Sequence, residues 1–349
     1  MLISIYYSIH YLSGYYLSGM NNLTFPILRL LADGRFHSGE AIAQHFNVSR
    51  TTVWSALQEA AALGVEVFSV RGRGYKLPEA ITLLDRDAVL KAIGEERAWF
   101  NLELHDQLES TNSYLMKQAS SGAAHATCVA ASLQTRGKGR RGRAWQARLG
   151  SSLTFSLLWR FQTGASALSG LSLAVGIGLI RALHAMGVGA AKLKWPNDVL
   201  VNQEKLAGIL IELQGDTEGP SAAVIGIGIN LRLPENLKQH IDQAAIDLET
   251  VTSQSVNPSP INPSELLGLL LKKLAAVLSE FENNGFESLR EEWMQHHAYQ
   301  GQIVRLSLPD GREMQGVVNS IAPDGVLLVE TNTGMQRFSA GEISLRGVS

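Results

Sequence analysis

The chain has 349 residues, 45% of them hydrophobic and 18% charged, and its formal net charge is −2. These values are ordinary for a globular protein of two or three domains with a sizeable core. They exclude a uniformly basic surface, so any affinity for nucleic acid must come from a local patch of cations.

The first twenty residues are rich in Tyr, Ile, Leu and Ser and carry no Lys or Arg. They lack the basic region and the small-residue cleavage site of a signal peptide. Serine, histidine and glycine interrupt the apolar run, which falls short of the roughly 20 apolar residues of a membrane span. We expect residues 1–20 to be a disordered or non-native extension, with Met20 as the start of the protein. An anchoring amphipathic segment is the alternative.

The only cysteine is Cys128, which lies in an apolar run. A single cysteine cannot form a disulfide within the chain, and this fits the reducing cytoplasm. We expect its thiol to be a packing group, not a nucleophile.

Residues 25–77 have the pattern of three short helices followed by a hairpin. The first helix ends at Asp33-Gly34, Ser38 caps a second helix over 39–46, and Ser49 caps a third. The apolar positions of the third helix face inward, so its first turns would face the major groove of DNA. The outward residues that we expect to contact DNA are Arg50, Thr51, Thr52 and Ser55.

A basic hairpin follows the third helix. Residues 65–70 alternate as a strand, Arg71 and Arg73 lie in a glycine-containing turn, and residues 75–77 return as the partner strand. The arginines of such a wing would lie along phosphates or in the minor groove. Three-helix modules also bind proteins, but the basic turn favours DNA. The sequence predicts a winged-helix DNA-binding domain over residues 21–80, followed by a linker.

Residues 88–299 alternate irregularly between strand and helix patterns. The segment 202–204 marks a hairpin, so the sheet is at least partly antiparallel. A helix over 168–186 and a second helix capped by Ser264 would pack on this sheet, which makes an α+β domain. The expected strands are residues 100–104, 127–134, 153–160, 191–195, 199–202, 206–214 and 222–231.

A basic, glycine-rich loop interrupts this domain at 137–143, where the sequence is GKGRRGR, and Trp145 follows it. Glycine lets the backbone approach a ligand closely, and successive amides bind anions. The loop therefore suits a phosphate or an acyl-phosphate, although neither the P-loop nor the Rossmann pattern occurs. A solvated basic turn or a nucleic-acid contact is the alternative interpretation.

Polar residues at the ends of strands accompany this loop. The sequence STN at 110–112 precedes a short helix and is locally an N-cap pattern, and Gln134 ends the strand that leads into the loop. The sequence KWPND at 194–198 bends at its proline, which is expected to expose Asn197 and Asp198. The sequence GIGIN at 226–230 places glycines in a strand, so another group must approach its backbone closely.

Four motifs in this order resemble the biotin–protein ligases. They are GKGRRGR with Trp145, KWPND, KLAGIL at 205–210 and GIGIN. With the winged helix in front, the chain resembles the bifunctional members of that family, which also repress biotin synthesis genes. The resemblance runs from about residue 23 to residue 346.

The resemblance implies a fold for the rest of the chain. The domain at 88–299 would contain a class II synthetase-like mixed sheet with helices. The segment 300–349 has turn signals at 309–311, 323–325 and 332–334, and short strands between such turns fit the small SH3-like β-barrel of the family.

The implied chemistry uses ATP and Mg²⁺ as co-substrates and biotin as the substrate, with no tightly bound metal. Biotin and ATP give biotinyl-5′-AMP, and the biotinyl group then passes to a lysine of a biotin carboxyl carrier domain. Adenylation supplies a good leaving group, so the protein must align the reactants and stabilise charge. The implied partners are that carrier and operator DNA, with a homodimer when the adenylate is bound and no membrane.

The resemblance also assigns roles to single residues. The uncharged ureido ring of biotin would be held by the neutral groups of Ser110, Thr111, Asn112 and Gln134. The biotin carboxylate and the phosphate would lie under Lys138, Gly139 and Arg140 of the loop and beside Lys205. The assigned catalytic residues are Arg140, which would retain the adenylate, and Lys205, which would face the developing charge.

Two further residues, Trp145 near the adenine and Asn230 near the nucleotide, complete the implied site. One position departs from the family, whose loop usually has arginine where this chain has Lys138. Lysine keeps the charge but loses the bidentate fork.

A switch between the two activities is implied as well. We expect an edge strand near residues 206–214 to pair either with its copy in a dimer or with the carrier, since sheet edges offer unpaired backbone groups.

Two other functions remain open at this point, a lipoate-type ligase and a non-catalytic biotin sensor that binds DNA. The basic loop and the winged helix argue against the first, and Arg140 with Lys205 argues against the second.

Overall fold

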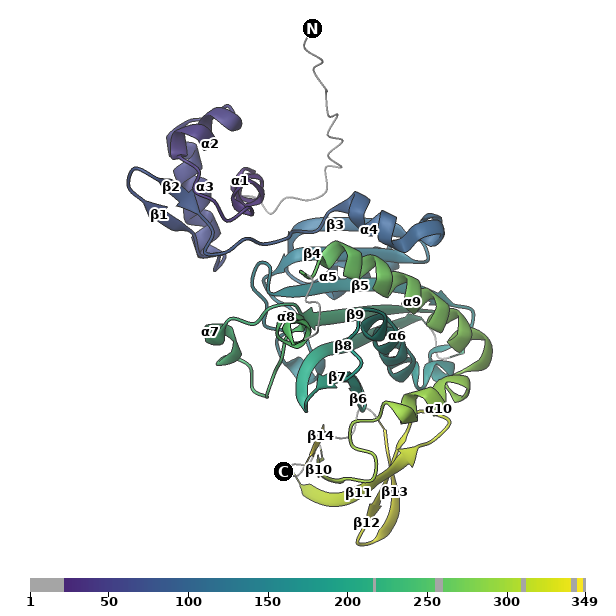
Figure 1. The fold of residues 1–349 in the computed structure, drawn as a ribbon. Coiled ribbons are helices and arrows are strands. Elements are labelled where there is room, and N and C mark those ends of the chain that lie inside the picture. Colours follow the sequence, from purple (N-terminus) through teal and green to yellow (C-terminus); the bar gives the residue numbers. More distant parts are fainter. Residues whose placement is uncertain (1–21, 216–217, 255–259, 309–311, 340–343, 348–349) are drawn as a thin grey trace. The chain divides into compact units, whose positions relative to one another are not determined.

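The chain folds into two units, Met1–Ile81 and Thr82–Ser349, and each is described by itself (Figure 1). The structure is a computed structural model that describes residues 22–215, 218–254, 260–308, 312–339 and 344–347. The expected extension at 1–20 and the expected turn at 309–311 lie outside the described residues.

The first unit begins with three helices, α1 (Thr24–Leu31), α2 (Gly39–His45) and α3 (Arg50–Ala62). Both expected caps are present, because Ser38 Oγ accepts from Ala41 N at 3.0 Å and Ser49 Oγ accepts from Thr52 N at 3.1 Å. The apolar faces of the helices form the core of this unit, which includes Ile27, Leu28, Leu31, Ile42, Val53, Leu57 and Ala60.

The hairpin of the first unit is shorter than expected. Its strands β1 (Phe68–Val70) and β2 (Gly74–Lys76) pair antiparallel, whereas residues 65–67 are not in the strand. Val65 is buried, and its backbone N–H donates to Ala60 O at 3.0 Å, which closes the end of α3. The carbonyl groups at the helix end need such donors, so the first alternating residue serves the helix and not the hairpin.

The second unit is built on a mixed sheet of seven strands in the order β3-β4-β5-β9-β8-β7-β6. Only β3 and β4 pair in parallel, and the other neighbours are antiparallel. The strands are β3 (Asn101–Leu108), β4 (Thr127–Gln134), β5 (Ser152–Phe161), β6 (Lys192–Lys194), β7 (Asp198–Val201), β8 (Glu204–Gly215) and β9 (Ser221–Asn230).

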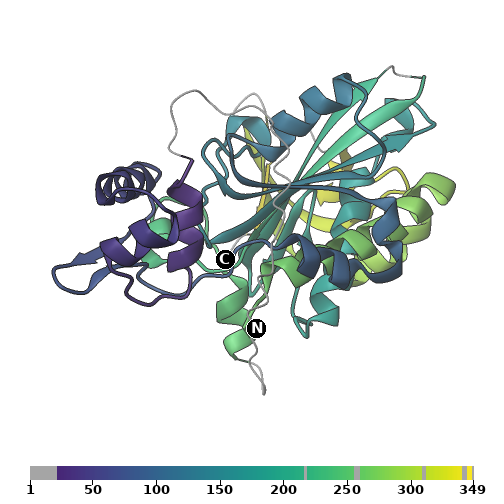
Figure 2. The ribbon, with the colours of Figure 1, turned by 90° about the horizontal axis from the view of Figure 1, so that it is seen from above.

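Helices cover both faces of this sheet, as Figures 1 and 2 show. On one face α5 (Thr111–Ser120) packs on β4, β5, β9 and β8. On the other face lie α4 (Arg86–Ile93), α6 (Leu171–Ala185) and α9 (Pro263–Asn284). Helix α9 contacts both α4 and α6, and α6 and α9 contact the sheet. The larger hydrophobic core lies on this second face, and a smaller one lies under α5. The prediction of an α+β domain is therefore confirmed.

Two helix starts differ from the expected ones. The cap of α9 is Asn262, whose Oδ1 accepts from Ser264 N at 3.0 Å, while Ser264 Oγ accepts from Asp85 N at 2.9 Å. Proline suits the first helical position because it has no N–H to satisfy, so the helix begins before the serine. Helix α6 begins after Gly170, whose φ of 82° breaks the expected helix, and residues 165–168 form a separate 3₁₀ turn.

The remaining elements of the second unit before residue 300 are short. They are η1 (Gly94–Trp99), η2 (Arg140–Gly142), η3 (Ala165–Leu168), α7 (Glu235–Lys238), α8 (Leu248–Ser253) and α10 (Glu287–Gln295). No helix among the described residues combines the length and the apolar character that crossing a membrane requires.

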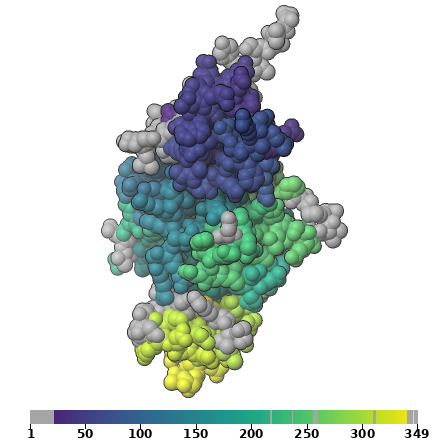
Figure 3. All heavy atoms as spheres, turned by 90° about the vertical axis from the view of Figure 1, so that its left-hand side faces the viewer, coloured from purple at the N-terminus to yellow at the C-terminus, as the bar shows by residue number. Residues whose placement is uncertain are grey.

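The chain ends in a five-stranded antiparallel sheet with the order β13-β12-β11-β10-β14. Its end strands, β13 and β14, are not paired with each other in the part of the chain described. The sheet lies directly beside the rest of the second unit (Figure 3), where Trp195 Nε1 donates to Gly325 O at 3.1 Å. Its strands are β10 (Ile303–Ser307), β11 (Glu313–Ile321), β12 (Leu327–Thr331), β13 (Gly334–Phe338) and β14 (Ser344–Gly347).

A buried histidine makes the stability of this region depend on pH. His297 is only 7% exposed, its ring lies 4.7 Å from that of Trp293, and burial lowers its pKa to about 4. The folded chain therefore binds fewer protons than the unfolded chain between about pH 4 and pH 6.5, so its stability falls as the pH drops through this window.

We expect His297→Gln to remove much of this loss, which amounts to about 3 kcal/mol for a pKa difference of this size. Urea unfolding of both proteins at pH 7 and pH 4.5 measures it, with His240→Gln, a histidine outside the core, as the control. An equal loss of stability in the wild type and in His297→Gln would contradict the assignment.

Candidate active site

An inner pocket opens where the start of α5, the end of β4 and the basic loop meet strands β5, β8 and β9. All the residues that the resemblance assigned to biotin line it, namely Ser110, Thr111, Asn112, Gln134, Lys138, Gly139, Arg140 and Lys205. Residues from 110 to 228 of the sequence are thus brought to one cavity. The start of α5 and the loop meet there because both follow strands that end at the same side of the sheet.

The floor of the inner pocket is a chain of neutral hydrogen bonds. Gln134 Oε1 accepts from Thr111 N at 2.7 Å and from Thr111 Oγ1 at 3.1 Å. Ser156 Oγ lies 2.8 Å from Thr111 Oγ1 and donates to Asn112 Oδ1 at 2.6 Å. All four side chains are buried. Satisfied neutral groups in an apolar setting fix their own orientations, so the pocket is preorganised for an uncharged polar ligand.

Ser156 was not among the residues expected from the sequence. It lies in the middle of β5 between buried apolar residues, and its partner across the sheet is Gly226. A serine within a buried apolar strand needs a hydrogen-bonding partner, and this is the signal in the sequence that could have identified it.

The glycines of β9 are where other groups approach the strand, as expected. A Cβ on Gly226 would collide with the amide of Asn112, and a Cβ on Gly228 would lie 2.5 Å from Cε2 of Trp145. Trp145 also covers Gly208 of β8 and lines the inner pocket. The indole can approach β8 and β9 this closely only because these two positions carry no side chain.

The basic loop is held by its own backbone. Gly139 N donates to Arg143 O at 2.7 Å, and Trp145 N donates to Gly137 O at 2.9 Å. Arg141 has φ 57° and ψ 38°, a left-handed conformation that costs a non-glycine residue energy. Lys138 is exposed, and its backbone pairs with Ala144. The loop is therefore a defined turn, and its Lys138 and Arg140 line the inner pocket.

A second, outer pocket of about 390 Å³ adjoins the first. The two pockets share Gly139, Arg140, Trp145, Asn197 and Lys205 as walls. Asn230 lines only the outer one, along with Asp198, Asp242 and other residues. The cations at the common wall thus lie where a group bridging the two pockets would pass.

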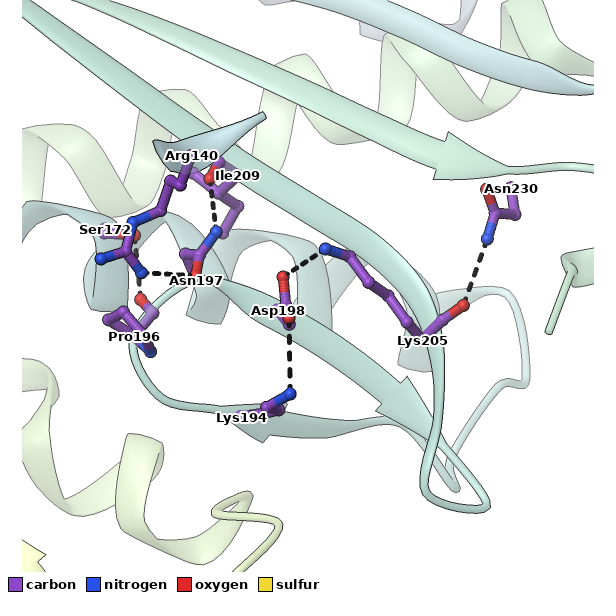
Figure 4. A network of polar contacts seen from close by, with 9 residues as sticks. All are labelled: Arg140, Ser172, Lys194, Pro196, Asn197, Asp198, Lys205, Ile209 and Asn230. Carbon is purple, nitrogen blue, oxygen red and sulfur yellow. Dashed lines mark hydrogen bonds and ion pairs between the residues drawn. The ribbon is translucent and has the colours of Figure 1, made fainter. Parts of the chain in front are cut away.

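Figure 4 shows the polar network at this wall. Arg140 Nη1 donates to Asn197 Oδ1 at 2.9 Å, and Asn197 Nδ2 donates to Ile209 O at 2.9 Å. Lys205 Nζ lies 2.6 Å from Asp198 Oδ1, while Lys194 Nζ lies 3.8 Å from the other oxygen of Asp198. Each catalytic candidate is therefore fixed by one residue of the KWPND segment.

This pairing corrects two expectations. Asn197 and Asp198 are not exposed by the bend at Pro196. They are partly buried, and the Asp198 side chain is 12% exposed. Burial of a carboxylate requires a charged partner, which Lys205 supplies.

Asn230 has a structural task beside its place in the outer pocket. Its Nδ2 donates to Lys205 O and to Ile246 O, both at 3.1 Å. The side-chain amide thereby joins the end of β9 to the start of β8 and fixes the backbone that carries Lys205.

Burial lowers the pKa of the Arg140 guanidinium from its usual value, and the neighbouring charge of Arg141 acts in the same direction, while Asp198 opposes it. An arginine remains protonated in spite of such a shift. An unscreened, partly desolvated cation attracts an anion more strongly than one in water, so Arg140 is suited to hold a phosphate.

The outer pocket is the part of the site that could receive a metal ion. Among the residues that the structure describes, no three His, Cys, Asp or Glu side chains are grouped as a metal site would need. The outer pocket is lined by the carboxylates of Asp198 and Asp242. Mg²⁺ is usually held by one or two carboxylates together with substrate phosphates, so this wall fits an ion that arrives with a nucleotide.

The first unit carries the candidate DNA contacts. Arg50, Thr51 and Ser55 are exposed on α3, but Thr52 is partly buried, and its hydroxyl lies 2.9 Å from Ser49 Oγ. Thr52 thus also takes part in the helix cap, and its contact with DNA stays a prediction. Trp54 is 55% exposed on the same helix and is a further candidate contact that was not expected from the sequence. It follows the buried Val53, and helical periodicity could have placed it on the outer face.

The arginines of the hairpin are exposed as well. The Arg73 guanidinium lies 4.2 Å from the ring centroid of Phe36, a cation–π contact that limits its orientations. Arg71 lies at the tip of the turn, which would suit a contact with a flexible phosphate backbone.

Comparison with known proteins agrees with this architecture. The profile of the biotin/lipoate A/B protein ligase family matches residues 104–230, an HTH domain matches 24–76, and the biotin protein ligase C-terminal domain matches 299–346. The bifunctional ligase/repressor BirA of Salmonella typhimurium is 35% identical over 329 residues, which cover 94% of this chain and 99% of that protein.

Two more relatives agree. BirA of Escherichia coli is 32% identical over 93% of this chain and 98% of its own length. The biotin protein ligase from Aquifex aeolicus, solved in complex with biotin and ATP, has a TM-score of 0.60 and 28% identity, over 71% of this chain and 99% of that one. The chain therefore belongs to the biotin–protein ligase family, in its bifunctional ligase/repressor form.

Proposed function

We propose that this protein is an ATP-dependent biotin–protein ligase that also acts as a biotin-responsive repressor. Biotin and ATP react to biotinyl-5′-AMP and pyrophosphate, and the biotinyl group is then transferred to a lysine of a carboxylase carrier domain. The observation that carries this proposal is the pair of adjoining pockets with Arg140 and Lys205 in their common wall.

The chemistry follows from the order of groups along the two pockets. The neutral network of Thr111 and Gln134 would receive the ureido ring in the inner pocket, with Ser110 and Asn112 beside it. The carboxylate would then lie at the common wall, where it attacks the α-phosphate of the nucleotide in the outer pocket. Lys205 and Arg140 stabilise the charge that grows on the phosphate oxygens. Lys138 and Gly139 would close over the product.

Nucleotide binding is assigned to the outer pocket. The indole of Trp145 offers a flat apolar surface for the adenine, and ATP would bring Mg²⁺ to the side of the pocket that Asp198 lines. Asn230 acts there by fixing the backbone of Lys205. Because Lys138 replaces the usual arginine of the loop, we expect a weaker grip on the phosphate at that point without loss of the reaction.

Biotin-dependent exchange of labelled pyrophosphate into ATP tests the ligase proposal. The purified chain with Mg²⁺ and ATP should catalyse exchange with biotin and none with lipoate, and it should label a carrier domain. Exchange with lipoate alone would identify a lipoate ligase. Binding of biotin without any exchange would identify a non-catalytic sensor.

The repressor activity rests on the winged-helix unit. We propose that residues 21–80 bind a two-fold operator as part of a homodimer, that residues 88–299 carry the ligase site, and that the segment 300–349 supports it. The upper half of β8, beyond Gly208, pairs with β9 but has no β7 partner, whereas residues 206–208 lie inside the sheet. This half of β8, which pairs with β9 alone, is the candidate edge for a dimer or a carrier.

This shared edge is tested by sedimentation. With biotin and ATP present, a carrier domain whose target lysine is replaced should compete with dimer formation. Dimers that persist at saturating carrier would contradict a shared edge, but not the ligase activity.

We also propose that the protein works in the reducing cytoplasm, as its single cysteine led us to expect.

The wing arginines give a quantitative prediction. Replacing both Arg71 and Arg73 with alanine should reduce the slope of log affinity against log salt by about 1 to 2, since each phosphate contact releases condensed counterions. Fluorescence anisotropy with operator DNA at several salt concentrations measures the slope, with exposed Lys91→Ala of α4 as the control. An unchanged slope would remove the wing from the interface.

A further inference from the structure

We propose that Glu212 is a positioning residue of the biotin pocket, which acts through Asn112. This inference rests on the proposed ligase function and adds to it a residue that no motif includes. Glu212 lies on β8 beyond Gly208, on the part of the strand that pairs with β9 alone. The proposal depends on how one side-chain amide spans three strands.

The side chain of Asn112 spans three neighbouring strands of the sheet, β5, β9 and β8. Ser156 on β5, Gly226 on β9 and Leu210 on β8 are register partners in a row. The amide of Asn112 lies over Gly226, where a Cβ would collide with it. Its two ends reach the strands on either side, since Ser156 donates to Oδ1 at 2.6 Å while Nδ2 donates to Leu210 O at 3.2 Å.

Glu212 takes the remaining N–H of this amide. Asn112 Nδ2 donates to Glu212 Oε2 at 2.9 Å, so both protons of the amide nitrogen are used on β8. An Asn side chain can rotate by half a turn and exchange its donor and acceptor ends. A carboxylate only accepts, so Glu212 permits one of the two orientations and would repel the other.

The orientation matters because it sets the direction of the whole network. With Oδ1 toward β5, the hydroxyl of Ser156 donates to Asn112, and Thr111 donates to Gln134. A reversed amide would present N–H groups to Ser156, whose proton would then turn toward Thr111. The donors and acceptors offered to the ureido group would change accordingly, and a buried ligand tolerates such a mismatch poorly.

The hydrogen bond from Asn112 to Glu212 is also strong enough to fix the orientation of the amide. A hydrogen bond to a charged acceptor is roughly twice as strong as one between neutral groups, and Asn112 is buried. The neighbouring contact on the same strand differs in this respect. Gln214 Nε2 donates to Ser120 Oγ at 2.8 Å, which ties the exposed end of α5 to β8 without reaching the pocket.

The two contacts define the experiment. In biotin-dependent pyrophosphate exchange, Glu212→Ala should raise the KM for biotin about tenfold, with kcat and the KM for ATP within about threefold of the wild type. Glu212→Gln keeps an acceptor oxygen but is neutral and can also turn a donor toward the amide, so it should recover only part of the affinity. Gln214→Ala removes the other link between α5 and β8 and should behave as the wild type.

Coupling to Asn112 completes the test. If Glu212 acts through that amide, Asn112→Ala and the double variant should have the same KM for biotin, because contacting residues are not additive. A KM unchanged by Glu212→Ala, or a Gln214→Ala effect as large, would overturn the proposal while leaving the ligase function intact. A wild type with no exchange would instead refute the proposed function itself.

Discussion

Lys205→Ala should lower the rate of adenylate formation by about 100- to 1,000-fold, the usual effect of removing one preorganised group that faces developing charge. Lys205 lies in the common wall of the two pockets, and Asp198 holds its ammonium group at 2.6 Å. Among the described residues, Lys205 is the only lysine that lines both pockets. Lys194 lines the outer pocket alone, and Lys138 lines the inner pocket alone and is exposed.

Single-turnover formation of biotinyl-5′-AMP measures this effect directly. Lys192→Ala is the matched control, since that lysine lies on neighbouring β6 and is exposed outside both pockets. Thermal unfolding of Lys205→Ala checks that the fold remains intact when Asp198 has lost its closest charged partner. A Lys205→Ala rate within threefold of the wild type would show that this cation is not part of the chemistry.

Arg140→Ala should release the adenylate about 10- to 100-fold faster, because a hydrogen bond to a charged group contributes about 1.5 to 3 kcal/mol. The guanidinium is partly desolvated, it is oriented by Asn197 at 2.9 Å, and it lines both pockets. We expect a smaller effect on the formation of the adenylate than on its retention, since Lys205 remains.

Trapping the released adenylate on free amines in solution separates the two effects. The variant should label added lysine or bystander proteins, whereas the wild type should label the carrier domain. Arg136→Ala is the control, because Arg136 precedes the loop, is exposed, and forms its ion pair with Glu109 at 3.5 Å, outside both pockets. Equal release from Arg140→Ala and the wild type would assign retention to another group.

The sequence was most informative where one residue type has one physical use. Glycines in an apolar strand required a close approach, and the structure places Asn112 over Gly226 and Trp145 over Gly228. The turn at 202–204 required an antiparallel pair, which β7 and β8 form. Caps at Ser38 and Ser49 were readable because serine satisfies helix N–H groups.

The sequence was least informative where a residue's partner lies far along the chain. Nothing near Asp198 or Lys205 alone shows that they pair, because the pairing depends on the register of β7 against β8. Asn230 is a typical polar strand end, yet its amide is used by two backbone carbonyls. Glu212 follows the last residue of a motif by only two positions, but its role depends on a helix that precedes it by about a hundred residues in the chain.

The burial of Cys128 has a practical consequence for the experiments above. This single cysteine is fully buried in β4, and burial raises the pKa of its thiol well above its usual range, with the charge of Glu103 acting in the same direction. Thiol reagents act on the exposed thiolate, so the native residue can stay in place while a new surface cysteine is labelled alone. A fluorophore attached at exposed position 136, which precedes the loop and lies outside both pockets, would then report nucleotide arrival at the loop in real time with the binding residues unchanged.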